Sequence, residues 1–284
     1  MRFKALLAIP FLSWGLSSCS APSARPAPTK PQAPAPAIAP APPPSAAISP
    51  VVPAPPSRPA QAPRVVSREI SGITFEGVAF DSSSHRLAVV DQPGGPGSRY
   101  ADARSAGIAV NGLAAINAGF FTPEGAPLGK LITSGKPVGS WNRASSLGSG
   151  VFLESTSGNL VIARREAVSA TAPQRELLQA GPLLIENGRP VSGLDPQKSA
   201  VRVLMIWTGG SQWWIGRTSS CTLAELASAL GQGSPTGGSI RHALNLDGGR
   251  SADLWVSNAV SGGPLTRRPA WNRPVRNFLV LISR

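Results

Sequence analysis

The sequence contains little cysteine, little histidine and little acid. Among its 284 residues are two Cys, two His and 14 Asp or Glu, against 27 Lys or Arg. The two histidines, His85 and His242, cannot supply a cluster of His and Cys metal ligands. The cysteines are Cys19 and Cys221, and if the N-terminal segment uses Cys19, Cys221 has no partner for an intrachain disulfide. We therefore expect a domain that folds without disulfides.

The N-terminus lacks an apolar run long enough to span a membrane, which takes about 20 residues. Residues 5–16 give only 12 positions, with Pro10 and Ser13 among them. They follow a basic stub, Arg2 and Lys4, and they precede small residues and a cysteine. This pattern is typical of a signal peptide that is removed, so we predict cleavage after residue 18.

The Leu16-Ser17-Ser18-Cys19 ending resembles the lipobox of bacterial lipoproteins. The resemblance implies that Cys19 becomes the mature N-terminus and carries lipid on its sulfur. The alternative is an ordinary secretory peptide with an incidental cysteine. Ser20 stands where an Asp would resemble the inner-membrane retention signal, so we expect an exported protein anchored in the cell envelope, on the outer membrane facing the periplasm.

Residues 21–64 lack acidic and aromatic side chains and hold 16 prolines in 44 positions. Such a segment cannot bury a hydrophobic core. Its proline content favours polyproline II, a semi-rigid spacer with a reach on the order of 100 Å. We predict that residues 19–64 tether a folded domain to the membrane. A ligand for proline-binding modules is the alternative, but the anchor immediately upstream favours the tether.

Acidic residues are too few to neutralise the chain, whose formal net charge is +13. The basic residues are dispersed, and no basic run exceeds the doublets Arg164-Arg165 and Arg267-Arg268. Helix-turn-helix and zinc-finger spacings are absent, which argues against a nucleic-acid partner. Anionic envelope polymers or phosphorylated sugars suit an exported basic protein better.

Residues 65–284 are long enough for one sizeable core. Short apolar and β-branched runs alternate with Gly, Asn and Pro, which predicts an α+β fold: a single β-rich domain with a few helices. The capping box Thr222-Leu-Ala-Glu225 predicts a helix that continues to Leu230, and residues 100–106 are a weaker helix candidate. The predicted strands cover residues 73–80, 85–90, 113–117, 151–153, 160–163, 183–186, 201–207, 212–216, 242–245, 252–256 and 275–282.

Three segments carry the functional pattern. They are Ile116-Asn117-Ala118-Gly119-Phe120-Phe121 with Pro127-Leu128-Gly129 after it, Gln179-Ala180-Gly181-Pro182, and Asn245-Leu246-Asp247-Gly248-Gly249-Arg250-Ser251. Together they resemble the phosphodiester glycosidase family over nearly all of residues 70–284. The family usually has glycine where this chain has Ala118, and often where it has Arg250. The resemblance implies that a sugar phosphodiester is the substrate class and that these segments form the site.

The residues around Asp247 predict a site independently of that resemblance. An apolar strand runs into Asp247-Gly248-Gly249, a sharp turn that needs positive φ, and the chain leaves through Ser251. Such a turn can present a carboxylate beside backbone N–H groups that form a nest for phosphate. Asp247 is then a base, a nucleophile or a metal ligand, whereas Asn245, Gly248, Gly249, Arg250 and Ser251 are predicted to bind substrate. The alternative is a plain Asp-Gly hairpin turn.

Two further segments supply candidate ligands. Asn117 ends a predicted strand, and its amide can donate to one sugar hydroxyl and accept from another. A turn-capping role is the alternative for Asn117. Phe120 and Phe121 are expected to divide into one wall of a sugar site and one core ring. Gln179 precedes the tight Gly181-Pro182 turn, where the backbone can approach a ligand.

Arginine suits phosphate because it can grip two oxygens at once, and the chain has 22 Arg and 5 Lys. Arg202 is the first candidate, since it opens a predicted strand where the family also has an Arg. Arg250 is the second, with a surface arginine as its alternative. We interpret His242 as structural, and we leave Asp253 open between a second carboxylate and a solvated strand position. Trp141 is the tryptophan that we expect beside the cleft.

A departing phosphate monoester has a second pKa of about 6 and needs little help from a general acid. The site must supply positive charge, N–H donors and a carboxylate near the anomeric carbon. We therefore predict a hydrolase acting on a phosphorylated glycan or glycolipid, with Asp247, Asn117 and Arg202 converging on one cleft and no cofactor, although Asp247 leaves room for one divalent ion. The alternative is a non-catalytic envelope protein that binds such a polymer. A two-metal phosphodiesterase is disfavoured because the His/Asp cluster is absent. The oligomeric state stays open.

Overall fold

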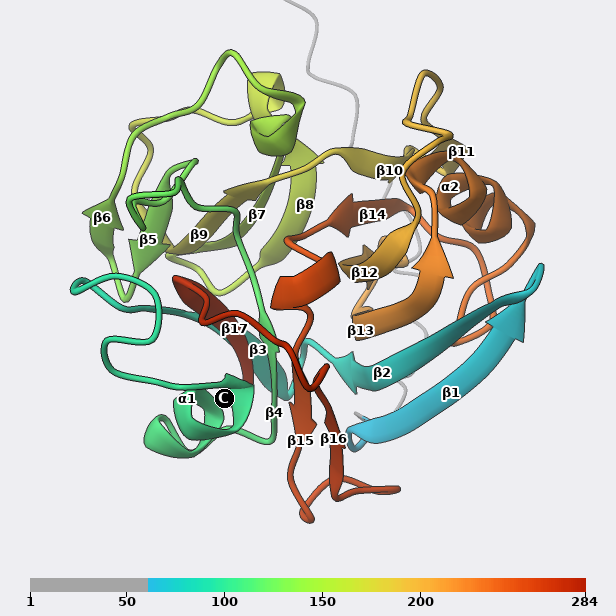
Figure 1. Ribbon diagram of the computed structural model, residues 1–284, viewed down its shortest axis with the longest axis horizontal. Coiled ribbons are helices and arrows are strands. Elements are labelled where there is room, and N and C mark those ends of the chain that lie inside the picture. Colours follow the sequence, from blue (N-terminus) through green and yellow to red (C-terminus); the bar gives the residue numbers. More distant parts are fainter. Residues whose placement is uncertain (1–60) are drawn as a thin grey trace, which may run out of the picture. The chain divides into compact units, whose positions relative to one another are not determined.

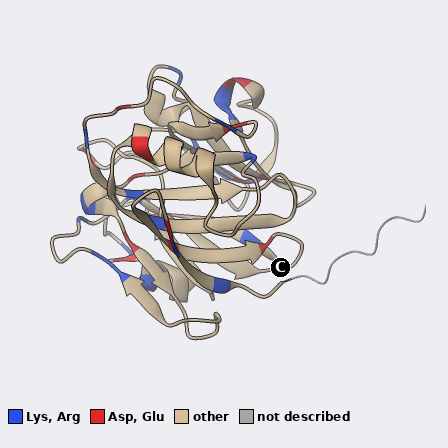
Figure 2. Cartoon of the chain, turned by 90° about the vertical axis from the view of Figure 1, so that its right-hand side faces the viewer, with Lys and Arg blue, Asp and Glu red and all other residues tan. Residues whose placement is uncertain are grey.

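The computed structural model describes residues 61–284, and the predicted signal peptide, Cys19 and nearly all of the tether lie outside the described residues. Of the helices in residues 61–284, none is long and apolar enough to cross a membrane. The chain described forms a single β-rich domain with two α-helices, as predicted (Figure 1). The Lys and Arg positions along the chain are scattered among its strands and loops (Figure 2).

The strands form three sheets, and neighbouring strands in each sheet are antiparallel. The large sheet has the order β1 (Arg64–Ile70), β2 (Ile73–Asp81), β13 (Gln212–Cys221), β12 (Ala200–Trp207), β14 (His242–Asn245), β10 (Leu183–Glu186), β11 (Arg189–Pro190). The second sheet has the order β16 (Leu265–Arg267), β15 (Leu254–Val256), β4 (Ala114–Asn117), β17 (Asn277–Ser283), β3 (His85–Asp91). The third sheet has the order β6 (Lys136–Val138), β5 (Leu131–Thr133), β9 (Gln174–Ala180), β7 (Gly150–Ser155), β8 (Leu160–Arg164).

The helices begin at capping residues. Thr222 caps α2 (Leu223–Gln232): its hydroxyl accepts from the Glu225 N–H at 3.1 Å, and the Glu225 carboxylate accepts from the Thr222 N–H at 2.8 Å. This confirms the predicted capping box. Asp102 caps α1 (Ala103–Ala109), which therefore starts three residues after the predicted position. Three 3₁₀ turns complete the structure: η1 (Ser146–Gly148), η2 (Arg165–Ala167) and η3 (Gly249–Ser251).

The main core lies where the three sheets meet. Val78 of β2, Ile116 of β4 and Phe152 of β7 are fully buried in one cluster. Because each sheet contributes one apolar face to this cluster, the loops that pass between sheets are held by packing on both sides. One of these loops carries Asp247.

Candidate active site

The loop after β14 passes from the large sheet to the second sheet. The Leu246 N–H donates to Val203 O of β12 at 2.8 Å, and the Asp247 N–H donates to Ala118 O beside β4 at 2.9 Å. Asp247 is thereby fixed between β12 of the large sheet and the end of β4 in the second sheet. The chain then turns through η3 and enters β15.

The two glycines of this loop are needed for different reasons. Gly249 has a φ of +60°, in the left-handed region that side chains other than glycine adopt at a cost. Gly248 has an ordinary extended φ, but a Cβ there would lie 2.6 Å from the carbonyl oxygen of Val201. The predicted positive φ therefore falls on Gly249, whereas Gly248 lets the loop pack directly on β12.

Asn117 fastens both ends of the loop. Its side chain is completely buried, and its Nδ2 donates to Asp247 O at 2.5 Å. Its Oδ1 accepts from the Asp253 N–H at 2.9 Å. Asn117 thus lies beside Asp247, and one N–H and the carbonyl oxygen of its amide bond to the backbone at the two ends of the loop.

The carboxyl group of Asp247 is held in an environment that favours its protonated form. Burial raises the pKa of Asp247 to about 6, while the Ser251 side chain, the Gly248 N–H and the nearby positive charge of Arg273 act in the opposite direction. A carboxyl group with a pKa this close to neutrality can both gain and lose a proton under physiological conditions. Asp247 is therefore suited to act as a base or a nucleophile.

A cavity of about 650 Å³ opens over Asp247. Its apolar walls include the predicted Phe120 together with Leu147, Leu194 and Leu223. The rest of its lining includes four more residues that the sequence predicted for the site: Arg202, Asn245, Gly248 and Gly249. Phe121, by contrast, packs against the core cluster around Tyr100 and Phe278. A cavity of this size, mostly apolar with a few convergent polar groups, is the usual form of a small-molecule site.

Arg202 brings positive charge to the cavity. Its Nε donates to Cys221 O at 3.0 Å and its Nη2 donates to Lys198 O. Carbonyl partners orient the guanidinium without neutralising it, and none of the ion pairs within residues 61–284 includes Arg202. Burial lowers the pKa of Arg202, yet an arginine remains charged at neutral pH. The nearby charge of Asp195 acts in the opposite direction on this pKa, but no carboxylate within residues 61–284 lies at ion-pair distance from Arg202, so its guanidinium can meet an anionic ligand.

Asn245 contributes an unused acceptor. Its side chain is 3% exposed, and its Nδ2 donates to Gly181 O at 2.9 Å. Its Oδ1 has no hydrogen-bond partner in the part of the chain that the structure describes. A buried acceptor without a partner is costly, and because Asn245 lines the cavity, an O–H or N–H of a ligand can satisfy it.

The structure places Gln179 and Arg250 outside the cavity lining. Gln179 is buried, and its amide makes four hydrogen bonds within the protein, to Lys130 N, to Asn142 N and O, and to Gly148 O. It has no donor or acceptor left for a ligand, so we correct its predicted role: Gln179 supports the loops that form the wall. Arg250 is exposed on η3.

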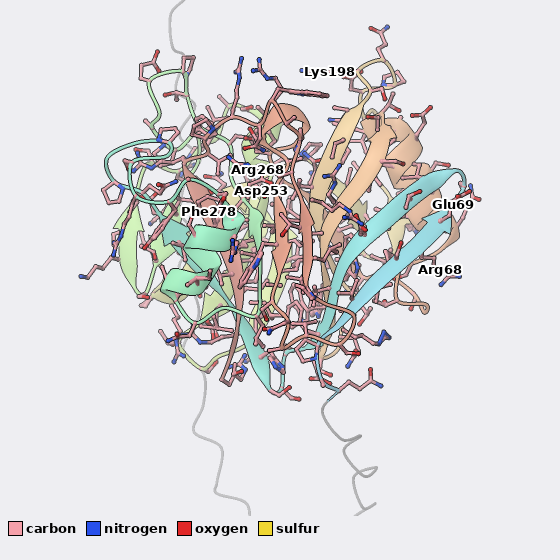
Figure 3. The ribbon with its side chains drawn as sticks, turned by 60° about the horizontal axis from the view of Figure 1, so that its bottom comes forward. Arg68, Glu69, Lys198, Asp253, Arg268 and Phe278 are labelled. Carbon is pink, nitrogen blue, oxygen red and sulfur yellow. The ribbon has the colours of Figure 1, made fainter. Side chains whose placement is uncertain are left out.

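Three other candidates are engaged in structural contacts. His242 is buried and stacks on Trp207, with 5.7 Å between ring centroids. Asp253 is buried, accepts from the Ala103 N–H at 2.8 Å and lies 3.7 Å from Arg268, beside it in Figure 3. Trp141 packs against the core cluster of the third sheet and does not line the cavity over Asp247.

Sequence reasoning missed several residues at the site. Lys198 and Asp195 line the outer part of the cavity from the loop before β12, and Lys198 projects from that loop in Figure 3. Leu147 enters from η1, which lies outside all three predicted site segments. No local pattern distinguishes these residues from other loop residues, so only their tertiary position reveals them. Within residues 61–284 no group of three or more His, Cys, Asp or Glu side chains is arranged to hold a metal ion.

Comparison with known families identifies the chain. Residues 111–282 match the model of the phosphodiester glycosidase family, which is more than half of the sequence. The chain belongs to this family, as the three sequence segments predicted. A search of curated proteins gave no match.

Solved structures show the same fold at low sequence identity. One is the catalytic domain of zebrafish N-acetylglucosamine-1-phosphodiester alpha-N-acetylglucosaminidase, auto-inhibited by its pro-peptide. It is 18% identical, with a TM-score of 0.55 over 80% of this chain and 85% of that one. Another is a hypothetical protein from Synechocystis, 17% identical, with a TM-score of 0.52 over 80% of this chain and 64% of that one.

Proposed function

We propose that this protein is a glycosidase of the cell envelope that cleaves a sugar from a phosphodiester-linked glycan or glycolipid. The observation that carries the proposal is the shared cavity of Asp247 and Arg202. A carboxyl group whose pKa is raised to about 6 and a guanidinium that forms no ion pair within residues 61–284 line the same 650 Å³ space. Membership in the phosphodiester glycosidase family supports the same chemistry.

In this proposal the charges divide the work. Arg202 and the backbone N–H of Gly249 hold the phosphate, which leaves as an anion without needing a strong general acid. The Asp247 carboxylate attacks the anomeric carbon or activates a water molecule there. Both roles require Asp247 to be ionised.

The remaining residues place the sugar and the carboxylate. Phe120 forms an apolar wall, and Asn245 Oδ1 accepts a hydrogen bond from a sugar hydroxyl or amide. Asn117 fixes the position of Asp247 through the backbone, and Ser251 favours its ionised form. We propose that the reaction needs no cofactor. If a single divalent ion binds at Asp247 instead, a chelator should abolish turnover.

Substitution of Asp247 tests the proposal in the full-length protein. Asp247→Asn keeps the shape of the side chain and removes its basicity, so turnover of UDP-N-acetylglucosamine or a simple sugar-1-phosphodiester should fall by several orders of magnitude. Affinity for a phospho-sugar should change by less than about tenfold, as expected for an interaction used mainly in the transition state. Arg202→Ala should weaken binding and turnover together.

Glu69→Gln is the control, because it removes one carboxylate charge from the exposed edge strand β1, outside the cavity. It should keep turnover within about tenfold of the wild type. The wild type could bind a phosphodiester-linked glycan but cleave no phosphodiester, with Asp247→Asn binding the glycan equally well. That result would show that the protein is a non-catalytic glycan-binding protein and not a glycosidase.

We also propose that the protein is exported and that Cys19 carries a lipid anchor. The sequence pattern around Cys19 supports this, and β1 begins at Arg64, where the proline-rich segment ends. Cys19→Ser should shift the protein from the membrane fraction to the soluble periplasmic fraction. Retention of the variant in the membrane fraction would contradict the anchor.

A further inference from the structure

The loop between β16 and β17 exposes a tryptophan. Trp271 is 68% exposed, whereas Trp213, Trp214 and Trp255 are each at most 8% exposed. Trp141 and Trp207 are partly buried against core clusters. Tryptophan is enriched at binding surfaces, because its indole ring can bury a large apolar area when a partner arrives.

Two hydrogen bonds hold this loop against the Asp247 loop. The Arg273 N–H donates to Arg250 O at 2.9 Å, and Asn272 Nδ2 donates to Ala252 O at 3.1 Å. Pro274 packs on Gly97 on the other side, where a Cβ would lie 2.9 Å from the proline ring. The two residues that follow Trp271 in the chain are thereby held beside η3, in the loop that also carries Asp247.

Some arginines of these two loops form ion pairs, and others do not. Arg267 lies 2.7 Å from Glu76, and Arg268 lies within 4 Å of Asp102 and Asp253, so their charges are partnered. Arg250 and Arg273 are exposed, and neither takes part in an ion pair within residues 61–284. Arg273 is also close enough to lower the pKa of Asp247. Unpartnered positive charge therefore lies beside the cavity together with an exposed indole.

We propose that Trp271, Arg250 and Arg273 form an accessory surface that binds the units of an anionic glycan chain next to the one held in the Asp247 cavity. The indole face packs on the apolar face of a sugar ring, and the two guanidinium groups pair with phosphates along the chain. That the cleaved sugar unit lies in the Asp247 cavity rests on the proposed function, whereas the accessory surface itself does not depend on it. A chain with alternating sugar and phosphate matches both chemistries at once.

A binding measurement tests the surface independently of catalysis. In the full-length Asp247→Asn protein, titration calorimetry with a phosphodiester-linked hexose-1-phosphate oligomer should give at least about fivefold tighter binding than with the monomer methyl ester. Adding Trp271→Ala should abolish this difference and leave binding of the monomer unchanged. Ile108→Ala, which removes the other large exposed apolar side chain from α1, is the matched control and should preserve the difference.

Other ligands test separately whether the surface recognises sugar rings through Trp271 and phosphates through the two arginines. A neutral dextran oligomer should bind weakly, and polyphosphate should bind in a way that Trp271→Ala does not change. Oligomer binding that is unaffected by Trp271→Ala, or equal affinity for the neutral oligomer, would overturn the accessory surface. If the oligomer shows the predicted Trp271 dependence while the wild type hydrolyses nothing, the surface stands and the proposed glycosidase activity fails.

Discussion

Asn117 Nδ2 donates a hydrogen bond to the main-chain carbonyl of Asp247 over 2.5 Å, although the two residues are 130 positions apart. The same amide accepts from the Asp253 N–H at 2.9 Å. One buried side chain therefore joins the start and the end of the loop that carries the candidate catalytic carboxylate. Because both contacts involve backbone atoms, the loop's position depends on Asn117 while its own side chains remain available for chemistry.

Asn117→Leu should destabilise the fold and impair the site together. Leucine has a similar shape, but it leaves Asp247 O and the Asp253 N–H without a partner in a buried place, which costs about 1–3 kcal/mol for each group. We expect the free energy of unfolding to fall by about 2–5 kcal/mol and turnover to fall by more than about 100-fold under conditions where the variant is folded. Denaturant titration and a phosphodiester assay measure the two effects. Asn159→Leu, at an exposed hairpin amide, should change neither appreciably.

The sequence predicted the fold class and most strands because burial patterns are local. Residues 242–245 and 183–186 coincide with β14 and β10, and the capping box at Thr222 marks the start of α2. β9 was missed because Gln-Arg-Glu-Leu-Leu-Gln-Ala has the composition of a helix, and only its neighbours β5 and β7 make it a strand. β1 was missed because it is a largely exposed edge strand.

Part of the candidate site was predictable because it is marked by local sequence motifs. A turn motif identified the Asp247 loop, and the resemblance to the family, which also has an Arg at this strand start, identified Arg202; both residues line the same cavity. The hydrogen-bond partners of Asn117 and Gln179 could not be predicted, since they come from segments distant in the sequence. An amide has the same appearance in a sequence whether it meets a ligand or a backbone carbonyl.

The pH dependence of turnover should report on Asp247. The pKa of Asp247 is raised from 3.8 to about 6, and the proposed mechanism needs the ionised form, so kcat/KM should fall as the pH drops through about 6. Ser251→Ala removes a contact that lowers the pKa of Asp247, and it should therefore move this acidic limb to higher pH. Ser157→Ala at an exposed hairpin is the control. An acidic limb that stays in place in Ser251→Ala would show that another group controls it.

A buried carboxylate pair should make stability pH-dependent. Glu154 and Glu176 face each other across β7 and β9, both almost completely buried, and Glu176 accepts from the Val89 N–H at 3.0 Å. Burial raises the pKa of Glu176 to about 7, despite Arg86 at 3.7 Å. The folded state thus binds a proton that the unfolded state, with a pKa near 4.5, releases earlier. Stability should therefore fall as the pH rises from about 4.5 through about 7.

Glu176→Gln should flatten this decline. Between pH 5 and pH 8 the unfolding free energy of the variant should improve relative to the wild type by about 2–3 kcal/mol, because the variant has no proton to lose there. Urea titrations at several pH values measure the difference. Glu69→Gln, on the exposed edge strand β1 (Figure 3), should leave the pH dependence unchanged. Parallel curves for wild type and Glu176→Gln would show that Glu176 is ionised throughout.

The two glycines after Asp247 should respond differently to alanine. Gly249→Ala places a side chain at a φ of +60° but meets no atom closer than 3.9 Å, so it should cost about 1–2 kcal/mol of stability and less than about tenfold in turnover. Gly248→Ala adopts an allowed φ, yet its Cβ would lie 2.6 Å from Val201 O, a backbone atom that cannot rotate away. The loop must then move off β12, which shifts Asp247 away from Arg202 in the cavity they share. Because displacement by even about 1 Å can reduce catalysis about 100-fold, Gly248→Ala should lose far more turnover than Gly249→Ala. Steady-state kinetics beside thermal unfolding of both variants measure this contrast, and a Gly248→Ala protein with wild-type kcat would show that the contact between the loop and β12 does not position the carboxylate.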